Sequence, residues 1–487
     1  MPGPSLSRLN GLCPRLSVAF KFRRVIDGAT NARHRVVGIK SGCDKGNGRL
    51  RVAVLVLVTA FSLGLPRATA FADESLPHLG GMMKNLVGPE RALFRKGSVA
   101  FQRVTSVQGG RSVSGTEQGL GPFFNLDSCA GCHAHPAVGG TSPTENPQIG
   151  AASKAGGLNQ VPAFMKRFGP IYQARRRHGP NGRPDGSIFP LFSIAGRSDA
   201  PGCNLPQLDV DGQWARGNLS LHVPTPVFGS GLIEAIPDTE ITDATRSDRE
   251  RKRRAGIAGR PSRVSAYGPI ARFGWKAQGL SLQQFTEEAY FSEEGVTGEL
   301  YGQKFLSPPA QCIFNVLPED RPNTLARTFQ ESLTNASLIV AFLRFLAAPE
   351  PQRPNEYGRK LFDDVGCGLC HAPRMRTGKS AYAVLSDRDV DLFSDLLLHH
   401  MGNGLADGIN QGAAGPDEFR TAPLWGVGQR LFLLHDGRAA SIGEAIEAHF
   451  SKPTHRTPAS EANNVVAAYR NLRPSDRQAL IDFLKSL

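Results

Sequence analysis

The sequence lacks a hydrophobic run long enough to cross a membrane. Its longest apolar stretch covers residues 52–65, and a membrane-spanning helix needs about 20 residues. Hydrophobic residues make up 40% of the chain, which is enough for globular cores and too few for a polytopic membrane protein. The sequence also lacks a basic patch interleaved with aromatic residues, so nothing in it points to nucleic acid as a partner.

The apolar stretch instead predicts an export signal. Arg49 and Arg51 precede it, and the small residues of Ala68-Thr-Ala70 and Ala70-Phe-Ala72 follow it, which is the pattern of a cleaved signal peptide. A single membrane anchor is the alternative. We expect residues 1–72 to be a leader and the mature protein to be periplasmic or secreted, with no membrane span. The leader holds most of the formal net charge of +14, so the high pI says little about the mature protein.

Cysteine is scarce, and half of the eight cysteines lie in two short motifs, Cys129-Ala-Gly-Cys132-His133 and Cys367-Gly-Leu-Cys370-His371. C-x-x-C-H is the attachment signature of c-type haem: the cysteines form thioethers and the histidine binds iron. Zinc would need four protein ligands per site, and neither motif has a second cysteine pair nearby. The motifs therefore predict two covalently bound haem c groups with His133 and His371 as iron ligands.

Two further cysteines of the mature chain, Cys203 and Cys312, are not claimed by haem. An exported protein meets an oxidising compartment, where unpaired thiols tend to be oxidised. We therefore expect a disulfide between them. Two buried free thiols, or a regulatory thiol pair, are the alternatives.

The chain reads as two unequal copies of one unit. Thr225-Pro-Val-Phe-Gly-Ser-Gly231 matches Ala422-Pro-Leu-Trp-Gly-Val-Gly428, and residues 339–346 match residues 480–487 as amphipathic helices. Ser475 with Gln478 predicts a capping box at the start of the last helix. The predicted fold is mainly α, with two cytochrome-c-like haem domains, the first enlarged by insertions. The Pro-rich stretch at 349–354 places the domains at residues 73–348 and 349–487.

Several stretches resemble the di-haem oxidoreductase family, whose relatives include bacterial di-haem cytochrome c peroxidases and the methylamine-utilisation di-haem enzyme. The resemblance lies in Gly119–Asn125, Phe228–Asp238, Arg272–Ala277, Asp395–Gly402 and His435–Arg438. It implies a peroxidase-like enzyme in which the N-terminal haem is the reaction centre and the C-terminal haem transfers electrons. Peroxide or another small oxidant would be the substrate, and a small redox protein, such as a c-type cytochrome or a copper protein, the electron donor.

For the second haem, the predicted sixth ligand is Met401, which lies 30 residues after His371 and is flanked by glycines. A gap-filling core methionine is the alternative reading. Met375 is too close in sequence to His371 to reach the opposite haem face easily, and His399 and His400 are weaker rivals. His435 is expected to bond a propionate or the backbone.

For the first haem, no methionine follows His133 until Met165, which favours an open iron. Peroxide cleavage then needs an acid/base near the distal oxygen. Glu234 is the predicted group because the second copy has Leu431 at the matching position, although a solvated or salt-bridged glutamate is the alternative.

Trp275 is the predicted bridge for electrons between the haems, as the resemblance implies. Trp425 and a simple core tryptophan remain alternatives. The competing functions are a pure electron carrier and an oxidoreductase acting on a sulfur compound or a partner protein.

Overall fold

The computed structural model describes residues 79–110, 113, 118–302, 307–352 and 355–487. The predicted leader and its cleavage site lie outside the described residues. All described residues fall within one unit, Ala70–Leu487. Among them helices predominate over strands, each of which has two to four residues, and this agrees with the predicted mainly helical character. The division into two haem domains stays a prediction.

The helices vary widely in length. The α-helices are α1 (Gly88–Gln102), α2 (Cys129–Cys132), α3 (Gln148–Ala151), α4 (Val210–Ala215), α5 (Ser230–Ala235), α6 (Asp238–Ala244), α7 (Arg249–Ala255), α8 (Leu282–Glu294), α9 (Phe329–Ser332), α10 (Asn335–Phe345), α11 (Glu356–Val365), α12 (Gly402–Leu405), α13 (Ile442–Ala448), α14 (Asn463–Arg470) and α15 (Pro474–Lys485). Short 3-10 turns are η1 (Lys154–Gly156), η2 (Ala310–Cys312), η3 (Cys367–Leu369), η4 (Ala383–Leu385) and η5 (Val427–Gln429). Within the described ranges, no helix combines the length and the apolar character that a membrane crossing requires.

The strands form small antiparallel sheets. The three-stranded sheet has the order β3 (Ile188–Phe189), β2 (Gln173–Arg176), β5 (Leu219–His222). The two-stranded pairs are β1 (Phe123–Phe124) with β4 (Phe192–Ser193), β6 (Ser262–Arg263) with β7 (Ile270–Ala271), β8 (Met375–Arg376) with β9 (Asp389–Val390), and β10 (Leu398–His400) with β11 (Glu418–Arg420). These sheets hold loops in place rather than forming a core layer of their own.

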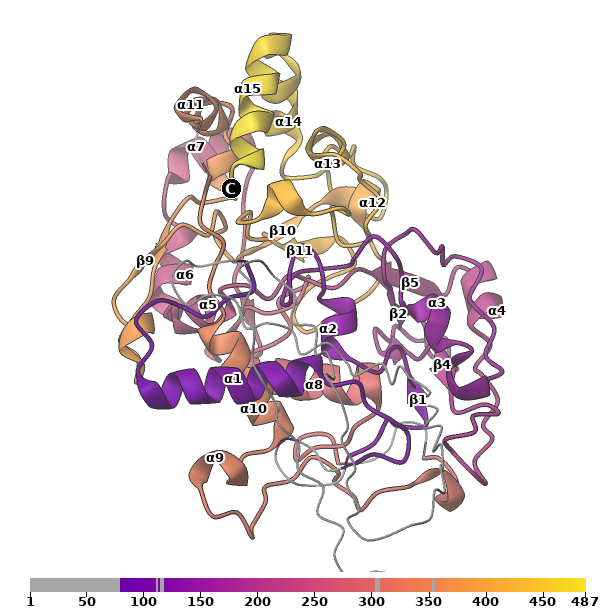
Figure 1. The fold of residues 1–487 in the computed structure, drawn as a ribbon. Helices are drawn as coiled ribbons and strands as arrows, with labels where there is room; N and C mark the ends of the chain where they lie inside the picture. Colours follow the sequence, from indigo (N-terminus) through magenta and orange to yellow (C-terminus); the bar gives the residue numbers. More distant parts are fainter. Residues whose placement is uncertain (1–78, 111–112, 114–117, 303–306, 353–354) are drawn as a thin grey trace, which may run out of the picture. The chain divides into compact units, whose positions relative to one another are not determined.

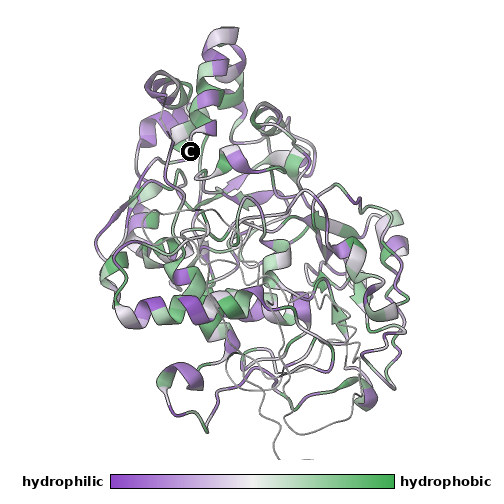
Figure 2. Ribbon diagram, viewed as in Figure 1, coloured by the Kyte–Doolittle hydropathy of each residue, from purple (hydrophilic) through white to green (hydrophobic). Residues whose placement is uncertain are grey.

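Helices α1 and α10 cross at very close range (Figure 1). Hydrophobic residues are interspersed with hydrophilic ones along α1 (Figure 2), and its buried positions include Phe94, Gly97 and Phe101. Gly97 permits the contact, because a Cβ there would lie 2.0 Å from the carbonyl oxygen of Leu338. The rings of Phe94 and Phe101 then pack on Phe342, with centroids 5.1 and 4.9 Å away.

Helices α11 and α15 repeat this contact. A Cβ at Gly358 would lie 2.1 Å from the carbonyl oxygen of Ala479, and Phe362 packs on Phe483 with ring centroids 5.5 Å apart. Phe483 and Phe342 are the residues that the sequence comparison aligns. The internal duplication predicted from the sequence is therefore present in the packing of the two helix pairs.

The repeated Pro-aromatic-Gly turns also take matching conformations. Gly229 and Gly426 adopt φ of 64° and 68°, which favours glycine. Two residues later, Gly231 and Gly428 lie against the carbonyl oxygens of Arg344 and Lys485, where a Cβ would approach to 2.0 and 2.2 Å. Each turn is thus fixed against the C-terminal end of the helix that belongs to its own copy.

One hydrophobic cluster spans the predicted boundary at residues 348 and 349. It contains residues of α1 and α10 together with Met375, Leu392, Leu397 and Trp425. A second cluster, built on α11, α14 and α15, lies entirely after the boundary. The boundary itself stays a prediction.

The predicted disulfide is confirmed. Cys203 and Cys312 are bonded, with their Cα atoms 4.9 Å apart. Both are buried in a third hydrophobic cluster that also contacts Cys132, so the bond joins the two insertions of the first copy beside the first haem motif.

The last helix begins where the sequence predicts, at Pro474, but the predicted capping box is wrong. Its N-cap is Arg473, and no side chain caps the first turn. Pro474 itself, which needs no N–H partner at the first helical position, marks the start.

Candidate functional site

The first C-x-x-C-H motif forms one helical turn, α2, and His133 follows it directly. The chain then folds back, with His135 bridging to Thr141, and this brings a carbonyl to the His133 ring. Nδ1 of His133 donates to the carbonyl oxygen of Gly140 at 3.0 Å. Glycine is required at this bend, because a Cβ at Gly140 would lie 1.9 Å from the carbonyl oxygen of His135.

The second motif reaches the same arrangement with different local structure. Cys367 begins the 3-10 turn η3, directly after α11, and Cys370 follows the turn. Nδ1 of His371 donates to the carbonyl oxygen of Phe393 at 3.1 Å. Burial, followed by the charge of the neighbouring His449, lowers the pKa of His371 to about 4, so this ring is neutral at pH 7.

Both motifs therefore fit haem. With Nδ1 donating to a carbonyl, the lone pair of each neutral ring lies on Nε2, the nitrogen that would bind iron. Burial also lowers the pKa of His133, which keeps that ring neutral. The four motif cysteines are thiols and not disulfides, so their sulfur atoms are available for thioether bonds.

Two arginines give a second indication of an anionic cofactor. Arg420 is buried and Arg430 is partly buried, and the described hydrogen bonds of both go to backbone carbonyls. Burial lowers the pKa of each to about 10; at Arg420 the charge of Arg430 adds to this effect and the charge of Asp395 opposes it. Both line a cavity together with Trp275 and Trp425. Haem propionates are the carboxylates that such a pair would neutralise.

A cavity lies beside the first motif. Cys132 and His133 form part of its wall, and Trp275 separates it from the cavity of the two arginines, since its side chain lines both. The polar residues of the wall include Gln173, Arg175, His222, Gln278, Glu288, Ser292, Glu293 and Gln411. The predicted iron ligand His133 and ionisable groups thus share one chamber.

The sequence matches the family described as di-haem oxidoreductase, putative peroxidase, over residues 190–487. The chain belongs to this family. As a di-haem oxidoreductase it is a peroxidase-like enzyme whose family carries two haems. The matched region includes the second motif and begins after the first, so the geometry of His133 is the evidence for the first haem. No curated protein matches the sequence.

Three solved structures show weak similarity. A MauG-like protein associated with microbial copper homeostasis is 14% identical, with 46% of this chain and 71% of that chain covered and a TM-score of 0.26. The diheme peroxidase BthA from Burkholderia thailandensis is 16% identical, with 81% and 86% covered and a TM-score of 0.27. Hydrazine synthase from Kuenenia stuttgartiensis is 14% identical, with 51% and 92% covered and a TM-score of 0.21. Similarities at this level do not bear on function.

The carboxylates of α8 are functional candidates that the sequence reasoning missed. Glu293 lines the chamber of His133 and accepts hydrogen bonds from Asn125 Nδ2 at 2.8 Å and from Gln173. Burial raises its pKa, against the opposing effect of these two bonds. Glu288 lies five residues earlier on α8 and faces Arg175 at 3.7 Å. A run of acidic residues at the end of a helix is a common surface pattern, so the sequence alone gave no reason to choose them.

The predicted acid/base Glu234 lies elsewhere in the di-haem oxidoreductase. Its carboxylate accepts from the backbone N–H of Leu282 at 2.9 Å and pairs with Arg344 at 2.8 Å. Among the described residues, the wall of the His133 chamber includes Glu288 and Glu293 but not Glu234. The catalytic role of Glu234 stays a prediction, while the salt-bridged alternative agrees with these contacts.

Trp275 and Trp425 both lie near the candidate haem sites. The indole Nε1 of Trp275 donates to the carbonyl oxygen of Val223 at 2.8 Å, which fixes the ring at the wall between the two cavities. Trp425 is buried in the core and packs against Gly229. The bridging role of Trp275 stays a prediction, and its place on both cavities is consistent with it.

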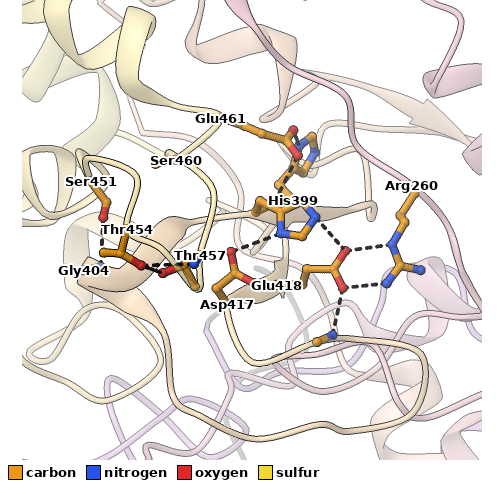
Figure 3. A network of polar contacts seen from close by, with 12 residues as sticks. Arg260, His399, Gly404, Asp417, Glu418, Ser451, Thr454, Thr457, Ser460 and Glu461 are labelled. Carbon is orange, nitrogen blue, oxygen red and sulfur yellow. Dashed lines mark hydrogen bonds and ion pairs between the residues drawn. The ribbon is translucent and has the colours of Figure 1, made fainter.

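Near the second motif, the rings of His399 and His400 are hydrogen-bonded to carboxylates. His399 bonds to Asp395 at 3.1 Å through Nε2 and to Glu461 at 2.7 Å through Nδ1. His400 bonds to Asp417 at 3.1 Å. Figure 3 shows the surrounding network, in which Arg260 also holds Glu418 with two hydrogen bonds. The network leaves neither nitrogen of His399 free for iron.

Met401 follows this pair at the N-cap of α12. Its backbone N–H donates to the carbonyl oxygen of Asp417 at 2.8 Å, a contact that does not depend on its side chain. Iron ligation by Met401 therefore stays a prediction.

A further repeat joins the two haem regions. Phe273 bridges to Gly279 and Leu433 to Ala439, closing two loops of equal length. Both loops have positive φ at the same two places: Gly274 with Leu434, and Ala277 with Gly437. Each loop then leads into a helix, α8 or α13, whose N-cap serine accepts a backbone hydrogen bond.

This second alignment pairs residues that the first alignment did not. Trp275 corresponds to His435, and Ala289 on α8 corresponds to His449, directly after α13. Ala289 lines the chamber of His133, and His449 is close enough to His371 to lower its pKa. Nδ1 of His449 donates to the carbonyl oxygen of Ala445 at 2.6 Å, which leaves Nε2 free.

Proposed function

We propose that this chain is an exported di-haem c-type cytochrome that works as a peroxidase-like oxidoreductase. One haem would be attached through Cys129 and Cys132, and the other through Cys367 and Cys370. His133 and His371 would bind the two irons through Nε2. When bound, haem iron supplies the electron-transfer and peroxide chemistry. The support is the matching pair of histidine–carbonyl hydrogen bonds and the family membership.

The different roles proposed for the two haems rest on one pair of corresponding residues, Ala289 and His449. This position of the duplicated loop and helix has a methyl group in the first copy and an imidazole nitrogen, Nε2, available in the second. An iron with an open sixth position can bind an oxidant, whereas a six-coordinate iron is suited to electron transfer. The first haem would therefore be the reactive one and the second the electron-transfer one, with His449 as its sixth ligand and the sequence-predicted Met401 as the alternative.

In this proposal, Glu293 is the residue that transfers a proton in the chamber of His133. Cleavage of a peroxide needs a group that takes a proton from the oxygen near the iron and gives it to the far oxygen. A carboxyl whose pKa is raised by burial is suited to exchange protons near neutral pH, and the pKa of Glu293 is raised in this way. Arg175 would hold negative charge that develops on the oxidant.

Electrons would arrive from a small redox protein, a c-type cytochrome or a copper protein, at the second haem. Trp275 would carry them onward, because its ring lines both cavities. The oxidant would be peroxide or another small molecule able to enter the chamber.

Export rests on the leader pattern of the sequence and on the Cys203–Cys312 disulfide. Structural disulfides persist in oxidising compartments and are rare in the cytosol. The proposed location is therefore periplasmic or secreted.

The test is the visible and near-infrared spectrum of the oxidised holoprotein. We expect one high-spin haem that shifts on cyanide addition and one low-spin haem that does not. Ala289→His should convert the first haem to low spin and abolish the cyanide shift. His449→Ala should give the second haem a high-spin band.

Met401→Ala serves as the matched variant for the second haem. An unchanged spectrum in Met401→Ala, with a changed one in His449→Ala, would assign the ligand to His449, and the reverse would assign it to Met401. Two low-spin haems inert to cyanide would indicate a pure electron carrier. A cyanide-responsive haem without peroxide turnover would favour a sulfur compound or a partner protein as the substrate.

A further inference from the structure

The chamber of the first haem motif is bounded by a buried charged triad that the mechanism above does not use. His222, at the end of β5, lines the chamber. Its Nε2 lies 3.0 Å from Oδ2 of Asp407, and the other carboxylate oxygen lies 2.9 Å from Nζ of Lys276. All three side chains are at most 4% exposed. Lysine and aspartate are almost never buried to this degree without a partner.

The orientation of the histidine follows from its partner. Asp407 also accepts the N–H of Ile409 at 2.9 Å, and although burial raises the pKa of this carboxyl, His222 and Lys276 lower it to below its ordinary value. An ionised carboxylate only accepts hydrogen bonds, so Nε2 of His222 is the donor. In the neutral ring the lone pair then lies on Nδ1, the nitrogen that does not contact the aspartate; a buried aspartate fixes the tautomer of its histidine in the same way in a catalytic triad.

The β2–β5 register places His222 next to the acid/base site. His222 pairs with Gln173 across the two antiparallel strands, and side chains that are directly opposite share one face of a sheet. Gln173 in turn donates to Glu293. Glu293, Gln173 and His222 therefore form a continuous polar stretch along one wall of the chamber.

Asp407 and Lys276 each make a further contact that fixes the triad in place. Ser220, two residues before His222 on the same strand, donates to the carbonyl oxygen of Asp407. Nζ of Lys276 lies over the ring of Phe419, 4.3 Å from its centroid. Because Lys276 follows Trp275 directly, the charged end of the triad is fixed to the loop that carries the proposed electron bridge.

Charge balance explains what the triad can do. With neutral His222 the Lys276–Asp407 pair has no net charge, and a proton on His222 adds one positive charge. Burial lowers the pKa of His222, against the opposing effect of Asp407. The other ionisable groups around this ring are Arg175 on β2, Glu288 and Glu293 on α8, and His435, whose ring meets that of His222 edge-on at 5.5 Å.

We propose that His222 is a second proton-transfer residue of the first haem's chamber, with Asp407 and Lys276 as the residues that position it. This inference rests on the proposed peroxidase-like function and extends it. Reduction of hydrogen peroxide to two waters consumes two protons and two electrons, the electrons coming from the redox donor. Glu293 moves a proton between the two oxygens without adding one. With that transfer the far oxygen leaves as the first water, so the two protons and the two electrons are needed to convert the remaining oxygen to the second water. His222 takes up a proton from solvent at Nδ1, relayed through chamber water, and gives it to this remaining oxygen.

The test compares three variants of the holoprotein: His222→Gln, Asp407→Asn and, as a control, His455→Gln, which changes an exposed histidine. The first readout is cyanide affinity of the first haem across pH, because hydrogen cyanide must lose its proton to a nearby base when it binds as the anion. We expect about tenfold weaker binding in His222→Gln, the loss of one hydrogen bond to a charged group. The control should match the wild type.

The second readout is the pH profile of kcat/KM for peroxide. His222→Gln should lose one ionisation from the profile and about 100-fold in rate, the lower range for removing an acid/base group. Asp407→Asn keeps the shape of the side chain but presents an amide N–H to Nε2, which moves the proton of the ring to Nδ1. It should show the same loss, and it provides the test if His222→Gln fails to fold.

The outcomes separate the two proposals. If wild-type protein binds cyanide but both variants keep its affinity and pH profile, with only a lower Tm, the triad is structural and this inference is wrong. If neither haem of the wild type binds cyanide, the proposed function fails and this inference fails with it. Loss of the ionisation in both variants, with normal behaviour of the control, supports it.

Discussion

Replacing Gly97 by alanine tests the helix contact that supports the first haem motif. The new Cβ would lie 2.0 Å from the carbonyl oxygen of Leu338 and 2.8 Å from Cβ of Phe342. Carbon atoms in contact settle about 3.5–4.0 Å apart, so α1 and α10 must separate by about 1 Å. Overpacking of this kind costs about 1–3 kcal/mol, and the better helix propensity of alanine returns about 1 kcal/mol. The obstacle is a backbone carbonyl, which cannot rotate away as a side chain can. We therefore expect the overpacking cost to lie near the upper end of its range, so that the free energy of unfolding falls.

The assay is denaturant unfolding of the holoprotein, followed by circular dichroism. Gly358→Ala should behave like Gly97→Ala, since the Cβ would lie 2.1 Å from the carbonyl oxygen of Ala479. Gly150→Ala is the matched control: this exposed helical glycine has nothing within 4 Å of an added Cβ, and its substitution should be neutral or mildly stabilising. Equal stability of Gly97→Ala and Gly150→Ala would refute the close contact.

Three further outcomes follow from the contacts. Cys203→Ser opens a loop closed over 109 residues and should lower the free energy of unfolding by up to about 4–5 kcal/mol; thiol titration of the denatured, unreduced variant should find one thiol, that of Cys312, and none in the wild type. Trp275→Phe should slow electron transfer between the haems in stopped-flow spectra without changing cyanide affinity, and an unchanged rate would exclude the bridging role. Burial raises the pKa of Glu461, but the bond and charge of His399 outweigh it and bring it from 4.5 to about 2. A lowered carboxyl pKa stabilises the fold above the unfolded value and loses that effect as pH falls, so Glu461→Gln should flatten the decline of Tm between pH 4.5 and 2.

The sequence was most informative where a residue type is tied to one backbone or chemical requirement. The two C-x-x-C-H motifs are visible because the attachment chemistry admits no substitute. The repeated turns are visible because Gly231 and Gly428 must leave room for a backbone carbonyl. The disulfide could be predicted because the two C-x-x-C-H motifs contain the other cysteines of the predicted mature chain.

The second repeat was hidden because its backbone requirement is met by unlike residues. Leu434 and Ala277 take positive φ of 70° and 48°, a conformation that normally marks glycine. Their partners in the alignment, Gly274 and Gly437, are glycines, but each loop has only one of the two. A comparison of residue types therefore finds no match, although the two loops have the same shape.

Buried charge was equally hard to predict. Lys276 and Arg420 carry charged side chains, which would ordinarily be assigned to the surface. Their burial depends on partners distant in sequence: Asp407 for Lys276, and the carbonyl of Gly274 for Arg420. Short-range patterns contain no information about such partners.

In a duplicated fold, the positions at which the copies differ are where their functions can diverge, and the alignment must be made segment by segment. The offset of the repeated turn pairs Glu234 with Leu431 and led to Glu234 as the acid/base. Insertions change the offset before the next segment, and the loop-and-helix repeat pairs Ala289 with His449. Among the described residues, Ala289 lines the chamber of His133, and His449 is close enough to His371 to lower its pKa. The same reasoning that selected Glu234 from the first offset thus selects, from the second, a residue pair that would leave one iron open and close the other in the proposed function.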